Sequence, residues 1–149
     1  MTAAATDAPD AVERTLILVK PDGVRRGLTG QILVRVEAKG YHLVAADLRV
    51  PAVELLAQHY AEHVAKPFYA PLVEFMSSGP VLAVVAEGQR VIEGFRALAG
   101  ATDPTAALPG TIRGDFGRDW GRSVQQNLVH GSDSPPAARR EIGLWFPHL

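Results

Sequence analysis

The sequence of 149 residues contains no cysteine, which excludes disulfides, thiolate nucleophiles and zinc–thiolate sites. It also has no apolar run approaching the roughly 20 residues of a membrane-spanning helix. The first twelve residues are rich in alanine and lack the basic and apolar regions of a signal peptide. These absences predict a cytoplasmic protein without membrane contact, in which residues 1–13 form a disordered extension.

A strong net charge is missing too. The formal net charge of −1 gives no whole-chain reason to expect binding to nucleic acid.

The two common glycine-rich phosphate-binding loops, G-x-x-x-x-G-K-[ST] and a strand-linked G-x-G-x-x-G, are absent. His59 and His63 have the spacing of two metal ligands on one helix, but no third ligand is evident. We interpret this pair as a packing or surface feature.

Hydrophobic periodicity predicts a single domain in which strands and helices alternate. We expect strands over Thr15–Val19, Tyr41–Val50, Val81–Ala86 and Leu128–Val129, and helices over Thr29–Lys39, Ala52–Tyr60, Phe68–Met76, Gln89–Leu98 and Pro135–Ile142. Lys20–Gly23 reads as a turn, and residues 101–126 carry little regular pattern. This order fits an α/β (α+β) fold, a ferredoxin-like βαββαβ sandwich with a four-stranded antiparallel sheet and extra helices. A small doubly wound sheet is the alternative.

The segment 127–134 offers a lone histidine suited to phosphoryl chemistry. His130 follows a short apolar strand and precedes a glycine that leaves space beside it. Near neutral pH much of such a histidine is uncharged and carries a free lone pair. Glu141, eleven residues further on in a helix, is placed to hold the second ring nitrogen. The competing interpretations are a structural histidine and a solvated helix carboxylate.

Three isolated cations stand out because they follow strands, lie in helices or occupy turns. Lys20 ends the first strand, Arg96 lies in a helix, and Arg113 occupies a loop rich in glycine and proline. Arginine suits bidentate contacts with phosphate, and lysine acts as a compact point charge. Taken singly, each is more often an ordinary surface cation. Phe68 at a helix start either packs in the core or stacks on a base, and its spacing favours the core.

Eight segments, in order along the chain, resemble the nucleoside diphosphate kinase family: Thr15–Gly23, Arg26–Gly30, His59–Tyr60, Lys66–Phe68, Ser78–Pro80, Thr111–Phe116, Asn127–Ser134 and Glu141–Phe146. The Asn-x-x-His-Gly-Ser-Asp pattern at 127–133 is the most specific of them. The resemblance covers nearly the whole chain and implies that residues 14–149 form a domain of this family with a ferredoxin-like core.

The resemblance implies a ping-pong reaction, in which a phosphohistidine on His130 carries the γ-phosphate from a nucleoside triphosphate such as ATP to a nucleoside diphosphate such as GDP. It implies that Glu141 and Ser132 orient the imidazole and that Lys20 assists. The residues expected to contact the nucleotide are Lys20, Tyr60, Phe68, Arg96, Thr102, Arg113, Val124 and Asn127, with Phe68 and Val124 on the two faces of the base. Mg²⁺ is the implied cofactor, held mainly by the phosphates and not by protein ligands. The implied assembly is a homo-oligomer, a tetramer or hexamer built from dimers.

Two other functions stay open at this stage. A non-catalytic nucleotide-binding or regulatory member of the family would be indicated by loss of His130, Lys20 or Asn127, and none of these is lost. A protein-histidine phosphotransferase or phosphatase would require a protein as acceptor.

The chain also carries an insertion near Arg118–Gly121 relative to the family. We favour a loop bulge without catalytic effect over altered nucleotide contacts or an altered oligomer interface.

Overall fold

The computed structural model describes residues 11–118 and 125–149. Along these ranges the elements are β1 (Val12–Val19), α1 (Pro21–Arg25), α2 (Thr29–Ala38), β2 (His42–Arg49), α3 (Val53–His59), a 3₁₀ turn (Ala61–His63), α4 (Tyr69–Met76), β3 (Val81–Gln89), α5 (Val91–Ala99), α6 (Ile112–Phe116), β4 (Val129–Gly131) and α7 (Pro135–Trp145). β1 begins inside the stretch that the sequence assigns to a disordered extension, at its last two residues.

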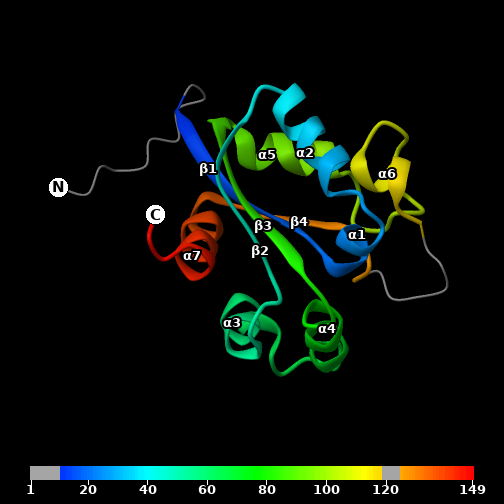
Figure 1. The fold of residues 1–149 in the computed structure, drawn as a ribbon, viewed down its shortest axis with the longest axis vertical. Coiled ribbons are helices and arrows are strands. Elements are labelled where there is room, and N and C mark those ends of the chain that lie inside the picture. The colour runs from blue at the N-terminus through cyan, green and yellow to red at the C-terminus, as the bar shows by residue number, and fades with distance from the viewer. Residues whose placement is uncertain (1–10, 119–124) are drawn as a thin grey trace.

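The strands form one antiparallel sheet in the order β2-β3-β1-β4 (Figure 1). β1 pairs with β3 along its whole length and with β4 at its end, so that Leu18 lies opposite His130. β2 pairs with β3, with a register irregularity between Leu43 and Ala45. This order and direction confirm the ferredoxin-like sandwich and rule out the doubly wound alternative, whose sheet would be mostly parallel.

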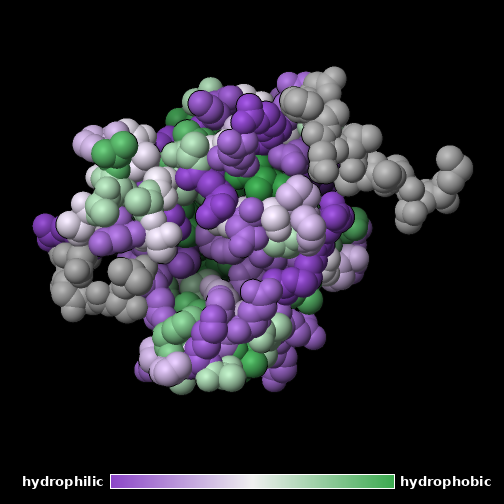
Figure 2. Space-filling model, turned by 180° about the vertical axis from the view of Figure 1, so that it is seen from behind, coloured by the Kyte–Doolittle hydropathy of each residue, from purple (hydrophilic) through white to green (hydrophobic). Residues whose placement is uncertain are grey.

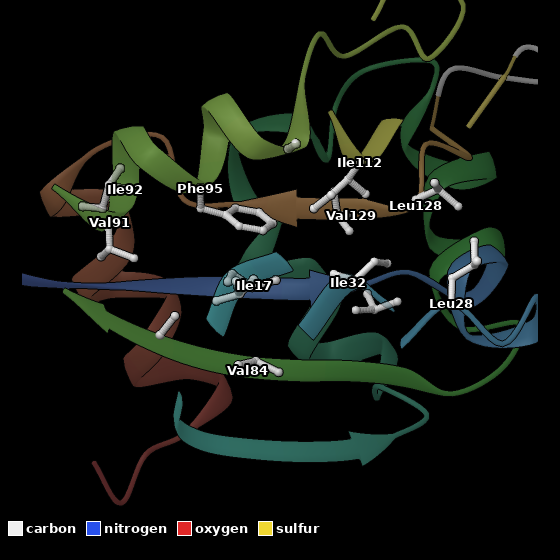
Figure 3. Close-up of a cluster of buried hydrophobic side chains, with 14 of the residues drawn as sticks. Ile17, Leu28, Ile32, Val84, Val91, Ile92, Phe95, Ile112, Leu128 and Val129 are labelled. Atoms are coloured by element: carbon white, nitrogen blue, oxygen red, sulfur yellow. The ribbon is translucent and has the colours of Figure 1, made fainter. Parts of the chain in front are cut away.

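Hydrophobic residues from both faces of the sheet explain why β1 is apolar without alternation. Residues 15–19 are completely buried. On one face, Ile17 and Val84 pack against α2 and α5, where Phe95 lies at the centre (Figure 3). On the other face, Leu16 and Leu18 pack against residues of α3, α4 and α7. A strand covered on both faces is a near-continuous hydrophobic run, as the sequence indicates.

Two short helices replace segments that the sequence leaves irregular. α1 begins at Pro21, whose fixed φ suits the first helical position, so the predicted turn continues as one helical turn. α6 begins after Thr111, whose hydroxyl accepts a hydrogen bond from the Gly114 amide at 3.0 Å. Both are too short to give a recognisable periodicity. Thr29 is the first residue of α2, and no side chain caps the start of this helix.

The longer elements deviate only at their ends. β3 continues to Gln89, beyond its expected end at Ala86, and α5 therefore begins later than expected. α7 continues to Trp145, which is buried against the sheet. In the part of the chain that the structure describes, no helix has the length and apolar character to cross a bilayer. Hydrophilic residues predominate on the face shown in Figure 2, with hydrophobic ones scattered among them.

Candidate active site

His130 lies in β4, on an edge strand of only three residues. Its side chain is partly buried, and its Nε2 lies 2.8 Å from Oε1 of Glu141 in α7. The glycine that follows is required here, because a Cβ at Gly131 would lie 2.5 Å from the Phe95 ring. The short strand and this close packing fix the backbone that carries the histidine.

Glu141 is held from a second side by Ser132. The hydroxyl of Ser132 donates to Glu141 Oε1 at 2.9 Å and accepts from the backbone amide of Leu16 at 3.1 Å. Burial opposes ionisation of Glu141, but the hydrogen bond from His130, with further contributions from the two histidines and Ser132, outweighs it and holds the pKa of this carboxyl below its ordinary 4.5. A carboxylate only accepts, so the Nε2 of His130 carries the hydrogen. Nδ1 is then the nitrogen with the free lone pair, and it has no hydrogen-bond partner among the described residues.

Lys20 is buried directly after β1, where its ammonium is fixed by two acceptors. Nζ donates to Asn127 Oδ1 at 2.8 Å and to the carbonyl of Gln125 at 3.2 Å. The amide nitrogen of Asn127 in turn donates to the carbonyl of Thr102 at 3.0 Å. Burial, followed by repulsion from Arg113, lowers the pKa of Lys20 to about 8. The lysine is therefore positioned rather than free to swing.

Arg113 lies in α6 and joins three segments through backbone carbonyls. Nε donates to Asn127 at 3.0 Å, Nη1 to Gly100 at 2.9 Å and Nη2 to Val129 at 2.7 Å. Burial, followed by repulsion from Arg96, lowers the pKa of Arg113 to about 10. Of the five N–H groups of the guanidinium, these bonds use three, and the remaining two are available to an anion.

Two hollows meet at His130. One, of about 430 Å³, contains the three cations and the loop residues around them: Lys20, Arg96, Thr102, Arg113 and Asn127 are among its lining. The other, of about 400 Å³, lies between the end of α3 and the start of α7 and is lined by residues that include His59, Tyr60, Glu62, His63 and Arg140. His130, Asp133 and Glu141 line both. The structure thus brings the predicted cations and the predicted nucleophile to one site.

Comparison with known proteins identifies this arrangement. The family described as Nucleoside diphosphate kinase matches residues 13–149. The chain belongs to that family. A nucleoside diphosphate kinase of Mycolicibacterium paratuberculosis is 61% identical over 136 residues, covering 91% of this chain and 97% of that protein. One of Thermobifida fusca is 57% identical over 138 residues, covering 93% of this chain and 99% of that protein.

Solved structures agree with the family assignment. The nucleoside diphosphate kinase of Halobacterium salinarum in complex with CDP superposes with a TM-score of 0.86 at 48% identity, covering 91% of this chain and 88% of the other. A family protein from Babesia bovis gives 0.85 at 49% identity, with 90% and 88% covered. The predictions of the family, of an enzyme and of a nucleotide-binding protein are therefore confirmed.

The aromatic residues expected to contact the nucleotide, Tyr60 and Phe68, lie at or beyond the edge of the two hollows. Tyr60 lines the second hollow, and burial raises the pKa of its hydroxyl above the ordinary value. Phe68 is 40% exposed, at the residue before α4, so the packing favoured by its spacing is only partly realised. The side chain of Gln125 donates to the Phe68 carbonyl at 3.3 Å, and Phe68 lines neither of the two hollows. Val124 and residues 119–121 of the insertion lie outside the described residues.

Sequence reasoning missed how the strained backbone before His130 is supported. Leu128 has a φ of +74°, a conformation that L side chains rarely adopt. Its amide donates to Asp22 Oδ2 at 3.2 Å, and its carbonyl accepts from the Lys20 amide at 2.8 Å. Arg113 holds the carbonyls on both sides of it. The Lys-Pro-Asp-Gly sequence predicts that Asp22 lies in a turn, but it does not predict the hydrogen bond from the Leu128 amide.

A second missed group has the donor types of a metal site. Ring nitrogens of His59 and His130 and an oxygen of Glu141 lie within 4.8 Å of one another. These atoms are already used in hydrogen bonds, because Trp145 donates to Nδ1 of His59 at 3.1 Å and Glu141 holds Nε2 of His130. The geometry fits two imidazoles, each held by its own hydrogen bond, better than it fits a bound metal ion.

Proposed function

We propose that this chain is a nucleoside diphosphate kinase that works by a ping-pong mechanism through a phosphohistidine on His130. The observation that carries the proposal is the fixed imidazole. Glu141 holds Nε2, so that Nδ1 carries its lone pair beside a hollow that contains Lys20 and Arg113. A nucleophile held next to positive charge is what phosphoryl transfer requires.

In the first half-reaction the lone pair of Nδ1 attacks the γ-phosphorus of the triphosphate. A P–N bond forms while the bond from phosphorus to the bridging oxygen breaks, and the diphosphate leaves with that electron pair. The imidazole gains positive charge, which the Glu141 carboxylate offsets at 2.8 Å. In the second half-reaction a terminal oxygen of another nucleoside diphosphate attacks the same phosphorus, and the P–N bond breaks. The histidine regains its lone pair.

Positioning and electrostatics supply most of the catalysis in this scheme. Charge in the loose transition state spreads over the phosphate oxygens, and preorganised donors stabilise it without rearrangement. Lys20, Arg96 and Arg113 come from three segments and surround one hollow. The half-exposed ring of Phe68 offers a face on which any base can stack, which would give broad nucleotide tolerance. Tyr60, Thr102 and Asn127 complete the proposed nucleotide contacts.

Mg²⁺ is the proposed cofactor, carried by the nucleotide. Asp133 is the carboxylate that suits it, because this exposed residue lines both hollows, where phosphates would lie. Asp115 lines neither hollow; its carboxylate accepts from Arg35 at 2.7 Å and from the Gly110 amide at 2.9 Å. The ion would neutralise phosphate charge and fix the triphosphate geometry.

A homo-oligomer and a cytoplasmic location belong to the same proposal. β2 lies at one end of the sheet, and Leu48, Val50 and Val53 on or near it are exposed hydrophobic residues. An edge strand of this kind pairs readily with another chain. This supports association of identical chains and leaves the number of subunits to measurement.

The test is incubation with γ-labelled ATP and Mg²⁺, followed by a chase with GDP. We expect an acid-labile, base-stable label on the protein that moves quantitatively to GDP. His130→Ala should take no label while it still binds nucleotide. Label that forms but moves only to a protein acceptor would favour a histidine phosphotransferase. Nucleotide binding without any label would contradict the proposal and favour a regulatory member of the family.

A further inference from the structure

One buried titratable group beside His130 has no role in the reaction described so far. His59 is the last residue of α3 and is only 5% exposed. Its ring meets the ring of His130 edge-on, with centroids 4.9 Å apart and planes at 75°. The two rings are in direct contact, so any movement of one is limited by the other.

Trp145 fixes the state of His59. The indole Nε1–H donates to His59 Nδ1 at 3.1 Å, and both side chains are buried. An indole nitrogen can only donate, so Nδ1 carries the lone pair and the hydrogen of the neutral ring is on Nε2. Burial, followed by the electrostatic interaction with His130, lowers the pKa of His59 to about 3. His59 is therefore a neutral ring in one tautomer.

The charged groups around this imidazole do not change that conclusion. Arg140, whose guanidinium donates to the His59 carbonyl at 3.3 Å, also disfavours its protonation, as does Lys20 from the other side of the site. Among the described residues that act on His59, Glu141 is the one that favours the charged form of the ring, and burial outweighs it. His130 completes the set of charged groups that act on His59.

Trp145 is itself held on two sides. The Arg49 guanidinium lies 5.1 Å from the centre of its ring, and Nη2 of the same arginine donates to the Trp145 carbonyl at 2.8 Å. Trp145 and Glu141 lie one helical turn apart on α7. A single helix thus supplies both constraints on the catalytic ring: Glu141 holds Nε2 directly, and Trp145 acts through His59.

We propose that His59, oriented by Trp145, is a positioning residue that fixes the rotation of the His130 ring and so directs the phosphoryl group to Nδ1 rather than Nε2. The inference rests on the proposed phosphohistidine. The terminal torsion of histidine is broad and roughly two-fold, and a half-turn exchanges Nδ1 with Cδ2 and Nε2 with Cε1. One hydrogen bond at Nε2 weakly opposes that half-turn. A ring packed edge-on against His130 blocks it sterically.

Two substitutions separate the ring contact from the hydrogen bond. His59→Asn keeps an acceptor near the position of Nδ1 but removes the ring. His59→Phe keeps a ring but leaves the indole N–H of Trp145 without its acceptor. The matched control is His42→Asn, which removes an exposed histidine on β2. Each protein is phosphorylated with ATP and Mg²⁺, and phosphorus NMR distinguishes the two phosphohistidine isomers.

We expect only Nδ1-phosphohistidine in the unaltered chain, in His42→Asn and in His59→Phe. His59→Asn should give a mixture of isomers and phosphorylate about 10- to 100-fold more slowly, as expected for a misplaced nucleophile. A folded His59→Asn protein with Nδ1-phosphate alone, formed at the unaltered rate, would overturn the inference. If this variant does not fold, Trp145→Phe decides, because it removes the hydrogen bond to His59 and also the part of the indole against which the His59 ring packs, whereas His59→Phe leaves that packing in place. We expect a second isomer there, and Nδ1-phosphate alone would again count against the inference. Absence of phosphohistidine from the unaltered chain would instead contradict the proposed function.

Discussion

Arg113 supports the backbone of the site through three hydrogen bonds, and in the proposed reaction it also contributes to catalysis. Replacement by lysine keeps the positive charge but removes the fork of N–H donors, so it tests what the hydrogen bonds contribute beyond the charge. The guanidinium donates to three backbone carbonyls in a fixed fork, whereas an ammonium can reach one of them without rearrangement. Hydrogen bonds from charged donors contribute about 1.5–3 kcal/mol each, and neutral ones about 1 kcal/mol. Loss of two in a half-buried site should lower the free energy of unfolding by roughly 2–4 kcal/mol.

The same substitution should also slow catalysis. The carbonyl contacts support Leu128 and Asn127 beside the histidine, so their loss displaces both Lys20 and the nucleophile. We expect kcat to fall about 10- to 100-fold in Arg113→Lys, and the full loss of roughly 2–4 kcal/mol in transition-state stabilisation in Arg113→Ala.

Urea unfolding followed by tryptophan fluorescence measures the first effect, and a coupled nucleotide assay measures the second. Protein concentration is kept constant, because association would shift the apparent stability. Arg139→Lys, an exposed arginine on α7, is the matched control and should change neither quantity. An unchanged free energy of unfolding in Arg113→Lys would refute the structural role of the three hydrogen bonds. An unchanged kcat would show that Arg113 does not contribute to catalysis.

Three further predictions concern charge. The pKa of Lys20 is near 8, so its ammonium loses its proton as the pH rises through that value. We therefore expect kcat/KM to decline above pH 8, and in Lys20→Arg we expect this decline to move to higher pH. A pH–rate profile checks both. Glu141→Gln should slow phosphorylation of His130 roughly 10- to 100-fold with nucleotide affinity unchanged. The pKa of Glu141 is lower in the folded state than its ordinary 4.5, so its ionised form stabilises the fold above pH 4.5, and this stability is lost as the pH falls through the folded-state value. In urea unfolding, Glu141→Gln should therefore lack this decrease in stability at acidic pH. Removal of Mg²⁺ with EDTA should abolish labelling of His130 by ATP without changing the unfolding of the protein, and restoration by added Mg²⁺ is the check.

The sequence predicted most of the elements that are long enough to have a period. β1 is a continuous apolar run because both of its faces are covered, and such a run is visible without a structure. α6 is different. It has five residues and depends on the cap from Thr111 and on the fit of Gly114, where a Cβ would lie 1.9 Å from the Leu108 carbonyl oxygen. No periodic pattern can reveal an element held by contacts of that kind.

The same distinction applies to the site. His130 and Glu141 could be proposed as partners because a turn and a helix return one to the other within eleven residues. The contact of His59 with Trp145 joins residues that are 86 apart, and it exists only because α3 and α7 pack on the same face of the sheet. Sequence spacing could suggest a role for His59 only through His63, its neighbour one turn away. Its actual partner was beyond that kind of argument.

The electrostatics of the site explain why its cations come from separate segments. Burial is the largest cause of the lowered pKa values of Lys20 and Arg113. Repulsion adds to it, from Arg113 at Lys20 and from Arg96 at Arg113, so the three positive charges oppose one another where they converge. Asp22 offsets part of this repulsion, and its carboxylate is committed to the Leu128 amide. The net positive potential can be tolerated because each cation is anchored in a different element of a rigid fold. A triphosphate would bring negative charge that relieves the repulsive part of both pKa shifts, while the part due to burial would remain. Its binding energy would therefore come partly from relief of a repulsion that the fold maintains, and this favours an anionic ligand over a neutral one of the same shape.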